Sequence, residues 1–209
     1  DIQSMKILIT GVAGLLGSRL TDWILENTDN LVVGIDDLSG GYIENVNPRI
    51  KFYKFNLIDL NKIDQVFDKE RPDIVYHFAA YAAEGLSPFI RKYNYENNLI
   101  CSTNLITKSI QYDIARFVFA SSMSVYGDKY EPPFHEGLQQ CPIDPYGIAK
   151  FSVEQDLKVA YEQHGLKYTI VRPHNFYGVN QKIGDKYRNV LGIRMYQVLN
   201  DMRPTIFGT

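Results

Sequence analysis

The chain alternates short apolar runs with longer segments in which apolar residues recur three and four positions apart. The short runs are rich in β-branched and aromatic residues and predict buried strands, whereas the longer segments predict helices. We expect strands at residues 6–10, 31–36, 51–56, 73–79, 116–122 and 167–173, and helices at 15–26, 60–69, 93–111, 146–163 and 189–200. Because the two kinds of element alternate, the pattern predicts an α/β fold with a doubly wound parallel sheet, covered by helices on both faces.

One stretch, residues 127–145, interrupts this alternation. It holds four prolines and few periodic positions, so we expect a surface loop that leads into the helix at 146–163. The chain has no internal repeat and no low-complexity segment.

Size and composition narrow the class of protein. A chain of 209 residues that is 45% hydrophobic and 13% aromatic is large enough to bury the core of one domain, or of one domain and part of another. A net charge of −2 with dispersed basic residues disfavours nucleic acid and anionic membranes as partners. Cys101 and Cys141 lack metal-ligand spacing, and the chain shows no secretion signal and no long apolar run. We therefore expect a cytoplasmic protein without a bound metal.

Residues 1–4 precede Met5, where a natural start would fit, and we expect them to lie outside the natural protein.

The first expected strand ends in a glycine-rich turn, with Gly11, Gly14 and Gly17 at three-residue intervals. A strand that turns sharply into a helix needs glycine where the chain reverses, where backbone approaches a pyrophosphate, and where helix packs against strand. The helix N-terminus then offers free N–H groups to phosphates. A tight turn without a ligand is the alternative. The position of the turn, between the first strand and a helix, favours a Rossmann-like dinucleotide site.

The second expected strand ends at Asp36, 19 residues after Gly17. A dinucleotide-binding unit has an acid at this distance, where it accepts hydrogen bonds from the adenosine ribose hydroxyls and repels a 2′-phosphate. The position predicts NAD rather than NADP. The alternative is that Asp36 or Asp37 only caps the following turn.

Tyr146 and Lys150 lie four residues apart and share a face of the expected helix. Such spacing is common in helices and does not by itself indicate a proton-transferring pair. A tyrosine can act as a base if nearby positive charge lowers its pKa from about 10 toward neutrality.

An ordered set of motifs decides between these alternatives. After the glycine turn come "HFAA" at 77–80, "NN" at 97–98, "SSMSVYG" at 121–127, "YGIAK" at 146–150 and "RPHNFYG" at 172–178. The set resembles the extended short-chain dehydrogenase/reductase family, in its group of nucleotide-sugar epimerases and dehydratases that includes the UDP-glucose 4-epimerases. The resemblance runs through nearly all of residues 6–208. It implies a Rossmann-like fold, bound NAD, and a nucleotide-sugar substrate with UDP-sugars favoured. It also implies a homodimer that pairs the helices starting near Tyr93 and Tyr146.

The resemblance also implies roles for individual residues. Tyr146 matches the general base, Lys150 assists it and binds the nicotinamide ribose, and Ser122 would hydrogen-bond the reacting sugar oxygen. The implied cofactor contacts are Gly11, Gly14, Leu15, Leu16, Gly17, Asp36, Asn56, Leu57, Ala79, Ala80, Asn97, Tyr146, Lys150 and Pro173. The implied substrate contacts are Ser122, Ser124, Tyr146, Asn175 and Asn189. His77, at a strand end, we interpret as a structural histidine.

Three positions bear on the choice of reaction. The chain has Ser122-Met123-Ser124 where the family's dehydratases resemble Thr-Asp-Glu and its decarboxylases resemble Thr-Ser-Glu. This motif holds no acid to protonate a leaving hydroxyl or to assist decarboxylation. We therefore expect epimerisation at sugar C4, in which a hydride leaves C4, a 4-keto intermediate turns over, and the hydride returns to the opposite face. The alternatives are a dehydratase, decarboxylase or reductase on the same scaffold, or a non-catalytic NAD-sensing module.

Two positions and the C-terminus depart from the family pattern. Asn56 stands where family members often have an acid for adenine, and Ala82 replaces a lysine that many epimerases place near the cofactor and substrate. Family members also continue beyond the last residue of this chain. We expect residues 5–172 to form the NAD-binding domain and 173–209 to begin an incomplete substrate domain. Such a chain would bind NAD with little or no turnover, because catalysis requires the sugar to be positioned.

Overall fold

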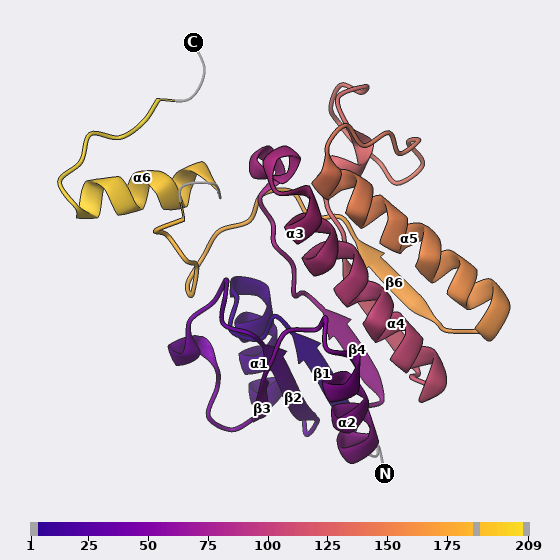
Figure 1. Cartoon of the computed structure of the whole chain (residues 1–209). Helices are drawn as coiled ribbons and strands as arrows, with labels where there is room; N and C mark the ends of the chain where they lie inside the picture. The colour runs from indigo at the N-terminus through magenta and orange to yellow at the C-terminus, as the bar shows by residue number, and fades with distance from the viewer. Residues whose placement is uncertain (1–3, 186–188, 207–209) are drawn as a thin grey trace.

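The computed structural model describes residues 4–185 and 189–206. Within them, six parallel strands form one sheet in the order β3-β2-β1-β4-β5-β6 (Figure 1). The strands are β1 (Lys6–Thr10), β2 (Leu31–Asp36), β3 (Lys51–Lys54), β4 (Ile74–His77), β5 (Arg116–Ala120) and β6 (Tyr168–Val171). This is the strand order of the Rossmann fold, and the order reverses between β1 and β4. The α/β prediction is confirmed, and every expected strand is present.

Four strands are shorter than expected. The expected ranges continue past the last paired residues of β3, β4, β5 and β6, but the backbone there leaves the sheet. Residues 55–56, 78–79, 121–122 and 172–173 instead begin the loops above the carboxyl edge of the sheet. The sequence pattern therefore locates each strand but not the residue at which the strand ends.

The helices lie close to their expected ranges. They are α1 (Leu15–Asn27), α2 (Leu60–Glu70), α3 (Arg91–Tyr95), α4 (Cys101–Gln111), α5 (Pro145–His164) and α6 (Val190–Leu199). The helix expected at 93–111 is one rod with a π-helical turn, Glu96–Ile100, between α3 and α4. Short 3-10 helices occupy Ile43–Asn45, Glu84–Phe89 (η2) and Met123–Tyr126 (η4). Residues 127–144 form the expected loop.

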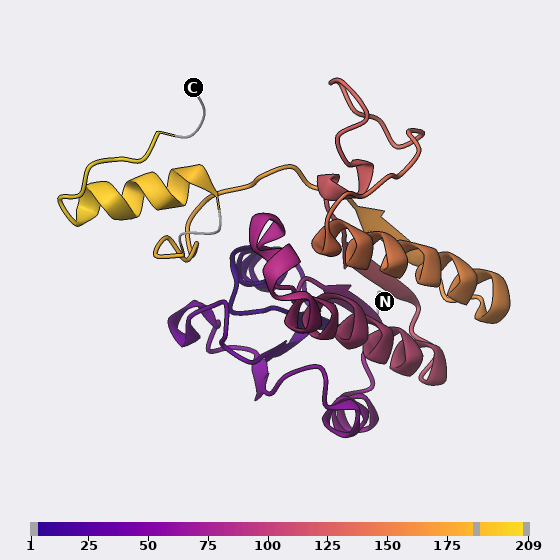
Figure 2. The same ribbon diagram turned by 45° about the horizontal axis from the view of Figure 1, so that its top comes forward.

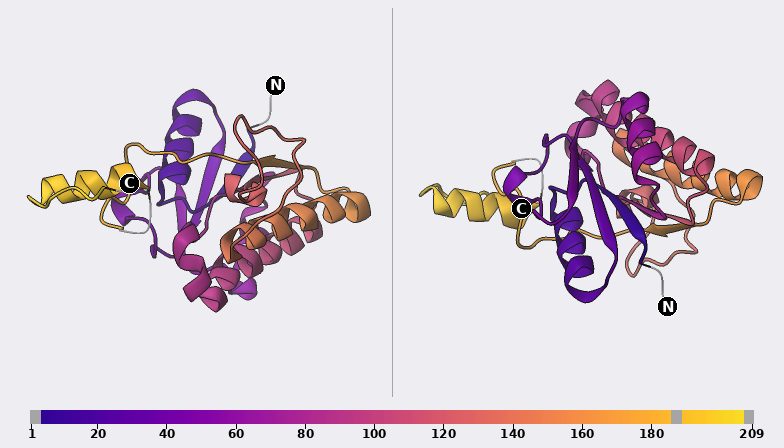
Figure 3. Two further views of the ribbon diagram at one scale, coloured as in Figure 1. Left: turned by 90° about the horizontal axis from the view of Figure 1, so that it is seen from above. Right: turned by 90° about the horizontal axis from the view of Figure 1, so that it is seen from below.

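The two faces of the sheet are covered by different helices (Figures 2 and 3). Alternate residues of β1 show this, because Leu8 joins the larger core with α2, α4 and α5, whereas Ile7 and Ile9 join a smaller core under α1. Side chains of a strand alternate between faces, so a single apolar strand supplies both cores.

Local sequence signals fix the ends of α5, the helix that carries the proposed catalytic pair. Asp144 caps its N-terminus, where the Asp144 carboxylate accepts a hydrogen bond from Gly147 N at 2.9 Å, and Pro145 occupies the first turn. Gly165 ends the helix in the left-handed conformation at φ 74°.

After β6 the chain crosses above the carboxyl edge of the sheet and reaches α6, which lies apart from the sheet in every view (Figures 1 to 3). Of the residues of α6, only Gly192 is buried. The expectations for residues 1–3 and for the end of the chain at 207–209 lie outside the described residues.

Candidate functional site

The glycine turn after β1 packs against the backbone that follows β4. Gly11 has φ 73°, and a Cβ there would lie 2.7 Å from Ala79 N. A Cβ on Gly17 would lie 2.2 Å from Gly11 O, so only glycine fits both positions. Helix α1 begins with Gly14 as its N-cap and without a capping side chain, which leaves its first N–H groups for a ligand.

Asp36 fits both interpretations that the sequence left open. Its carboxylate accepts hydrogen bonds from Ala13 N at 3.0 Å and from Leu38 N at 2.8 Å, so it does cap the turn. It also lines the cleft above the glycine turn. Burial raises the pKa of Asp36, and the two backbone hydrogen bonds oppose that shift.

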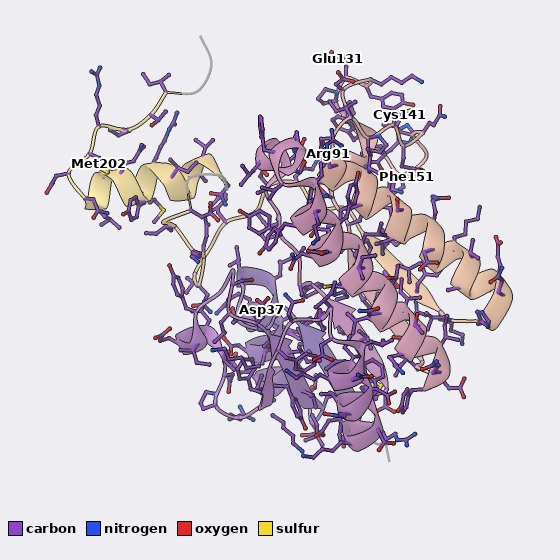
Figure 4. All side chains as sticks on the ribbon, viewed as in Figure 1. Asp37, Arg91, Glu131, Cys141, Phe151 and Met202 are labelled. Carbon is purple, nitrogen blue, oxygen red and sulfur yellow. The ribbon has the colours of Figure 1, made fainter. Side chains whose placement is uncertain are left out.

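The amide of Asn56 is held in a fixed orientation at the same end of the cleft. Its Nδ2 donates to Asp37 Oδ2 at 2.7 Å, and its Oδ1 accepts from Ile58 N at 2.9 Å. Asp37 therefore stands beside Asp36 at the carboxyl edge of the sheet (Figure 4). Sequence reasoning mentioned Asp37 only as a turn cap.

We call this cavity the first cleft. Eleven of the expected cofactor residues line it: Gly11, Gly14, Leu15, Leu16, Gly17, Asp36, Asn56, Leu57, Ala79, Ala80 and Asn97. The residues that sequence reasoning did not assign are Ile35, Asp37, Ser39, Gly40, Gly41, Phe78, Tyr81, Ala82, Tyr93, Cys101 and Phe176.

A second cleft adjoins the first. The remaining expected residues line it: Ser122, Ser124, Tyr146, Lys150, Pro173, Asn175 and Asn189. The two clefts share Gly14, Leu15, Leu16, Gly40, Phe78, Ala80, Ala82 and Phe176. Both lie at the carboxyl ends of the strands, where open α/β sheets bind ligands. One long ligand, or two ligands end to end, can therefore occupy them together.

Tyr146 and Lys150 are both buried in the wall of the second cleft, with exposed fractions of 7% and 2%. Lys150 Nζ donates to Ala120 O at 2.8 Å and lies 5.8 Å from the centre of the Tyr146 ring. Burial lowers the pKa of Lys150 to about 7, although Glu154 opposes the shift. An ammonium in this position is stabilised by any oxygen acceptor that a ligand brings.

The two serines of the motif differ in their hydrogen bonds. Ser122 Oγ accepts from Ser124 N at 3.2 Å and so caps η4. The Ser124 hydroxyl is buried and has no hydrogen-bond partner among the described residues, although Ser124 lines the second cleft. Buried hydroxyls are nearly always paired, so this cleft suits a ligand with polar groups.

An ion pair behind the second cleft joins the elements that carry it. Arg172, just after β6, donates to both carboxylate oxygens of Glu154 on α5 at 2.9 and 2.6 Å. It also donates to the Tyr126 hydroxyl of η4 at 2.6 Å. These hydrogen bonds raise the pKa of Arg172. The bidentate contact fixes α5, η4 and the end of β6 relative to one another.

His77 lies in the core and lines neither cleft. Its ring nitrogens contact Thr10 Oγ1 at 2.7 Å and Ser102 Oγ at 2.8 Å. Burial, together with the charge of Lys150, lowers the pKa of His77 to about 3. These contacts fit the structural role that the sequence suggested.

Several polar residues of the second cleft were not assigned from the sequence. They are Glu84, Ser121, His174, Asn180, Gln181 and Lys182. Glu84 carries a carboxyl group. From the sequence, an acid for dehydration or decarboxylation was considered only at positions 123 and 124. Glu84 comes from the loop after β4, and no sequence signal indicates that this loop meets the N-terminus of α5.

With the geometry described, the chain can be compared with known proteins. Residues 7–209 match the model of the NAD dependent epimerase/dehydratase family. The chain belongs to this family. It is 36% identical to the UDP-glucose 4-epimerase of Thermotoga maritima, solved with UDP-glucose, with a TM-score of 0.93 over 98% of this chain and 66% of the other. It is 31% identical to the Thermus thermophilus UDP-glucose 4-epimerase in complex with NAD, with a TM-score of 0.88 over 95% of this chain and 64% of the other.

A further relative is a putative UDP-glucose 4-epimerase of Methanocaldococcus jannaschii, 31% identical over 97% of this chain and 66% of the other. The chain spans about half to two thirds of the length of the curated relatives that it matches. These matches confirm the family and the Rossmann-like fold that the motifs predicted.

None of the helices among the described residues has the length and apolar character needed to cross a bilayer. No group of three histidine, cysteine, aspartate or glutamate side chains in the same part of the chain is arranged to hold a metal ion.

Proposed function

We propose that the protein is an NAD-dependent nucleotide-sugar epimerase that inverts C4 of a UDP-sugar through a 4-keto intermediate. The observation that carries the proposal is the continuity of the two clefts. The glycine turn and Asp36 lie in the first, Ser122, Tyr146 and Lys150 lie in the second, and eight residues line both. The names of the relatives, UDP-glucose 4-epimerases above all, support the same reaction.

The first cleft fits NAD. Gly11 and Gly17 allow a close approach of backbone segments that a Cβ atom at either position would block. The uncapped N-terminus of α1 suits a pyrophosphate. The Asp36 carboxylate suits ribose hydroxyls, and Lys150 provides a donor in the adjoining second cleft. Bound NAD would accept the hydride from sugar C4 and return it. The Thermus thermophilus relative was solved with NAD.

The chain's own residues would handle the proton and the orientation of the sugar. The Lys150 ammonium favours the phenolate form of Tyr146, which takes the proton of the sugar 4-hydroxyl as the hydride leaves C4 and returns that proton when the hydride comes back. Ser122 and the unpartnered Ser124 hydroxyl offer hydrogen bonds to sugar oxygens. Asn175 and Asn189 also line this cleft, and Asn189 caps α6.

Three properties of the whole protein belong to the proposal. We place the NAD-binding domain at residues 5–172 and the start of the substrate domain at 173–209, because β6 ends the sheet at Val171. We place the protein in the cytoplasm. We propose a homodimer through α3 to α5, because Phe89 just before α3, Ile143 just before α5 and Tyr161 within α5 expose 81%, 64% and 53% of their surfaces.

A dehydratase is the second candidate. The family description includes dehydratases, and Glu84 brings a carboxyl group into the second cleft. Incubating the full-length protein with UDP-glucose, UDP-glucuronate and dTDP-glucose, followed by mass spectrometry, separates the reactions. Epimerisation leaves the mass unchanged, dehydration removes one water, and decarboxylation removes carbon dioxide. Loss of water or carbon dioxide would overturn the epimerase proposal, and NAD binding without any turnover would favour a sensing module.

A further inference from the structure

Glu84 places a carboxyl group in the second cleft, beside the proposed catalytic residues. It is the first residue of η2, on the loop that follows β4, and its side chain is exposed at the wall that also includes Ser122, Tyr146 and Lys150. Glu84 is thus open to a ligand in the cleft.

The carboxyl group of Glu84 meets that of Asp144, the N-cap of α5. Asp144 Oδ1 is occupied, because it accepts from Gly147 N at 2.9 Å and from Ser87 Oγ at 3.4 Å. Asp144 Oδ2 is buried and receives no hydrogen bond within the described residues when both carboxyls are ionised. A proton on Glu84 provides the missing donor.

The surroundings favour that proton. Although Glu84 is exposed on its cleft side, partial desolvation and then the charge of Asp144 raise the pKa of Glu84. The other titratable side chains of the cleft are Tyr146, Lys150, His174 and Lys182. Lys150 donates to Ala120 O, and Lys182 donates to Ser39 O at 3.4 Å and lies over the Tyr42 ring. Neither contact pairs a lysine with Glu84.

Ser124 gives a separate reason to expect a polar ligand group in this cleft. Its hydroxyl is more than nine-tenths buried and has no partner among the described residues. Ser124 belongs to η4, which packs against the N-terminal part of α5, where Ser124 O would lie 2.8 Å from a Cβ on Gly147. The acid pair and Ser124 therefore both adjoin the first turn of α5.

We propose that Glu84 is a specificity residue of the sugar site, sharing one proton with Asp144, accepting a hydrogen bond from a sugar hydroxyl and excluding a sugar carboxylate. The proposal rests on the proposed nucleotide-sugar function and narrows its substrate class to neutral hexoses. A carboxyl that donates to Asp144 keeps its carbonyl oxygen free to accept from a hydroxyl. A uronate carboxylate at the same place would face the negative charge that the pair retains and would find no spare proton.

Affinity measurements on the full-length protein with NAD bound test this directly, using UDP-glucose, UDP-glucuronate and, as a control without a sugar, UDP. The wild type should bind UDP-glucose at least about tenfold tighter than UDP-glucuronate. Glu84→Ala should weaken the affinity for UDP-glucose by about tenfold and leave the affinity for UDP unchanged. Glu84→Gln can still donate a hydrogen bond to Asp144 and accept one from a sugar hydroxyl, so it should bind UDP-glucose with the affinity of the wild type. Glu84→Lys should shift the preference toward UDP-glucuronate.

The outcomes separate the two proposals. If the wild type binds UDP and UDP-glucose but Glu84→Ala changes neither affinity, Glu84 does not contact the sugar and only the present inference fails. If the wild type binds no UDP-sugar, the proposed function fails and the inference fails with it.

A second measurement tests the shared proton without any substrate. Carbon-13 NMR of the carboxyl groups should show Glu84 titrating above an ordinary glutamate in the 209-residue chain. Asp144→Asn keeps a good helix cap but offers Glu84 an N–H donor, and should move its pKa back down. An ordinary titration of Glu84 in the wild type would overturn the shared proton.

Discussion

The sheet with its helices and the segment around α6 bury their apolar residues very differently. Leu8 in β1 is fully buried, whereas Val198 and Leu199 in α6 expose 60% and 70% of their surfaces. Met202, just beyond α6, is 51% exposed and lies at the end of α6 that is farthest from the sheet (Figure 4). Both regions have the apolar periodicity of regular structure, but among the described residues only the first packs against another apolar surface. Stability therefore resides in the sheet and its helices.

The clefts follow the same division. The first cleft is built almost entirely from the sheet half, with Phe176 as its single residue beyond Val171. The second cleft draws Asn175, Lys182, Asn189 and other residues from the later segment. Cofactor binding should therefore depend on the well-packed half, whereas sugar binding should depend on both.

The largest expected effect comes from the same substitution in each region. Leu8→Ala should destabilise the fold by about 3 kcal/mol, because it leaves a cavity in the main core. Leu199→Ala should change stability by less than about 0.5 kcal/mol, as expected for an exposed position. Urea unfolding followed by circular dichroism measures both. Equal losses would show that α6 is packed as tightly as the sheet.

Removing the Tyr146 hydroxyl should separate binding from turnover. Tyr146→Phe should lower turnover of a UDP-sugar by at least about 10²-fold, the usual scale for a general acid or base, and retain NAD binding. Steady-state kinetics of the full-length protein and calorimetry with NAD give the two numbers. Turnover near that of the wild type would remove Tyr146 from the mechanism.

Burial of the Lys150 ammonium should lower the folding stability of the sheet and its helices. Because the pKa of Lys150 in the fold is about 7, below the ordinary 10.5, the unfolded chain binds the proton more tightly, and stability falls as pH decreases from about 10 to 7. Lys150→Met should therefore stabilise the NAD-free chain by about 1–2 kcal/mol at pH 7, with a gain that disappears near pH 10. A less stable variant at pH 7 would mean that the bond to Ala120 O outweighs the cost of burying the charge.

The smallest expected effect concerns cofactor choice. NAD should bind at least about tenfold tighter than NADP, because the Asp36 carboxylate suits ribose hydroxyls and repels a 2′-phosphate. Asp36→Asn should narrow that ratio, although it also weakens the cap on Ala13 N. Calorimetry on the 209-residue chain decides the matter, and equal affinities in the wild type would refute the role given to Asp36.

Local patterns in the sequence predicted most of the fold. The alternation of strands and helices was enough to predict a parallel sheet. Gly11 and Gly17 were identified from their spacing, and the structure shows that a Cβ atom would clash at both positions. The π-helical turn at Glu96–Ile100 was not predicted, because apolar residues three and four positions apart do not distinguish a regular α-helix from one with a single widened turn. The roles assigned to the site residues stay predictions, although all of them line the two clefts.

Contacts between distant segments could not be predicted in this way. Glu84 contacts Asp144 because the loop after β4 and the N-terminus of α5 lie close together in the fold. The periodicity of apolar residues along the chain does not predict contacts between such distant segments. The exposure of Val198 and Leu199 was likewise not predictable, since a helical pattern shows which face is apolar but not what covers it.

The measurement that most directly tests the central account follows the hydrogen on sugar C4. Full-length protein is incubated with UDP-glucose that carries deuterium at C4, and the products are analysed by mass spectrometry and NMR. If the two clefts hold NAD and the sugar together and return the same hydride, UDP-galactose should form with the deuterium still at C4. Loss of the deuterium to solvent, or its transfer to C6 with loss of water, would contradict the epimerase mechanism.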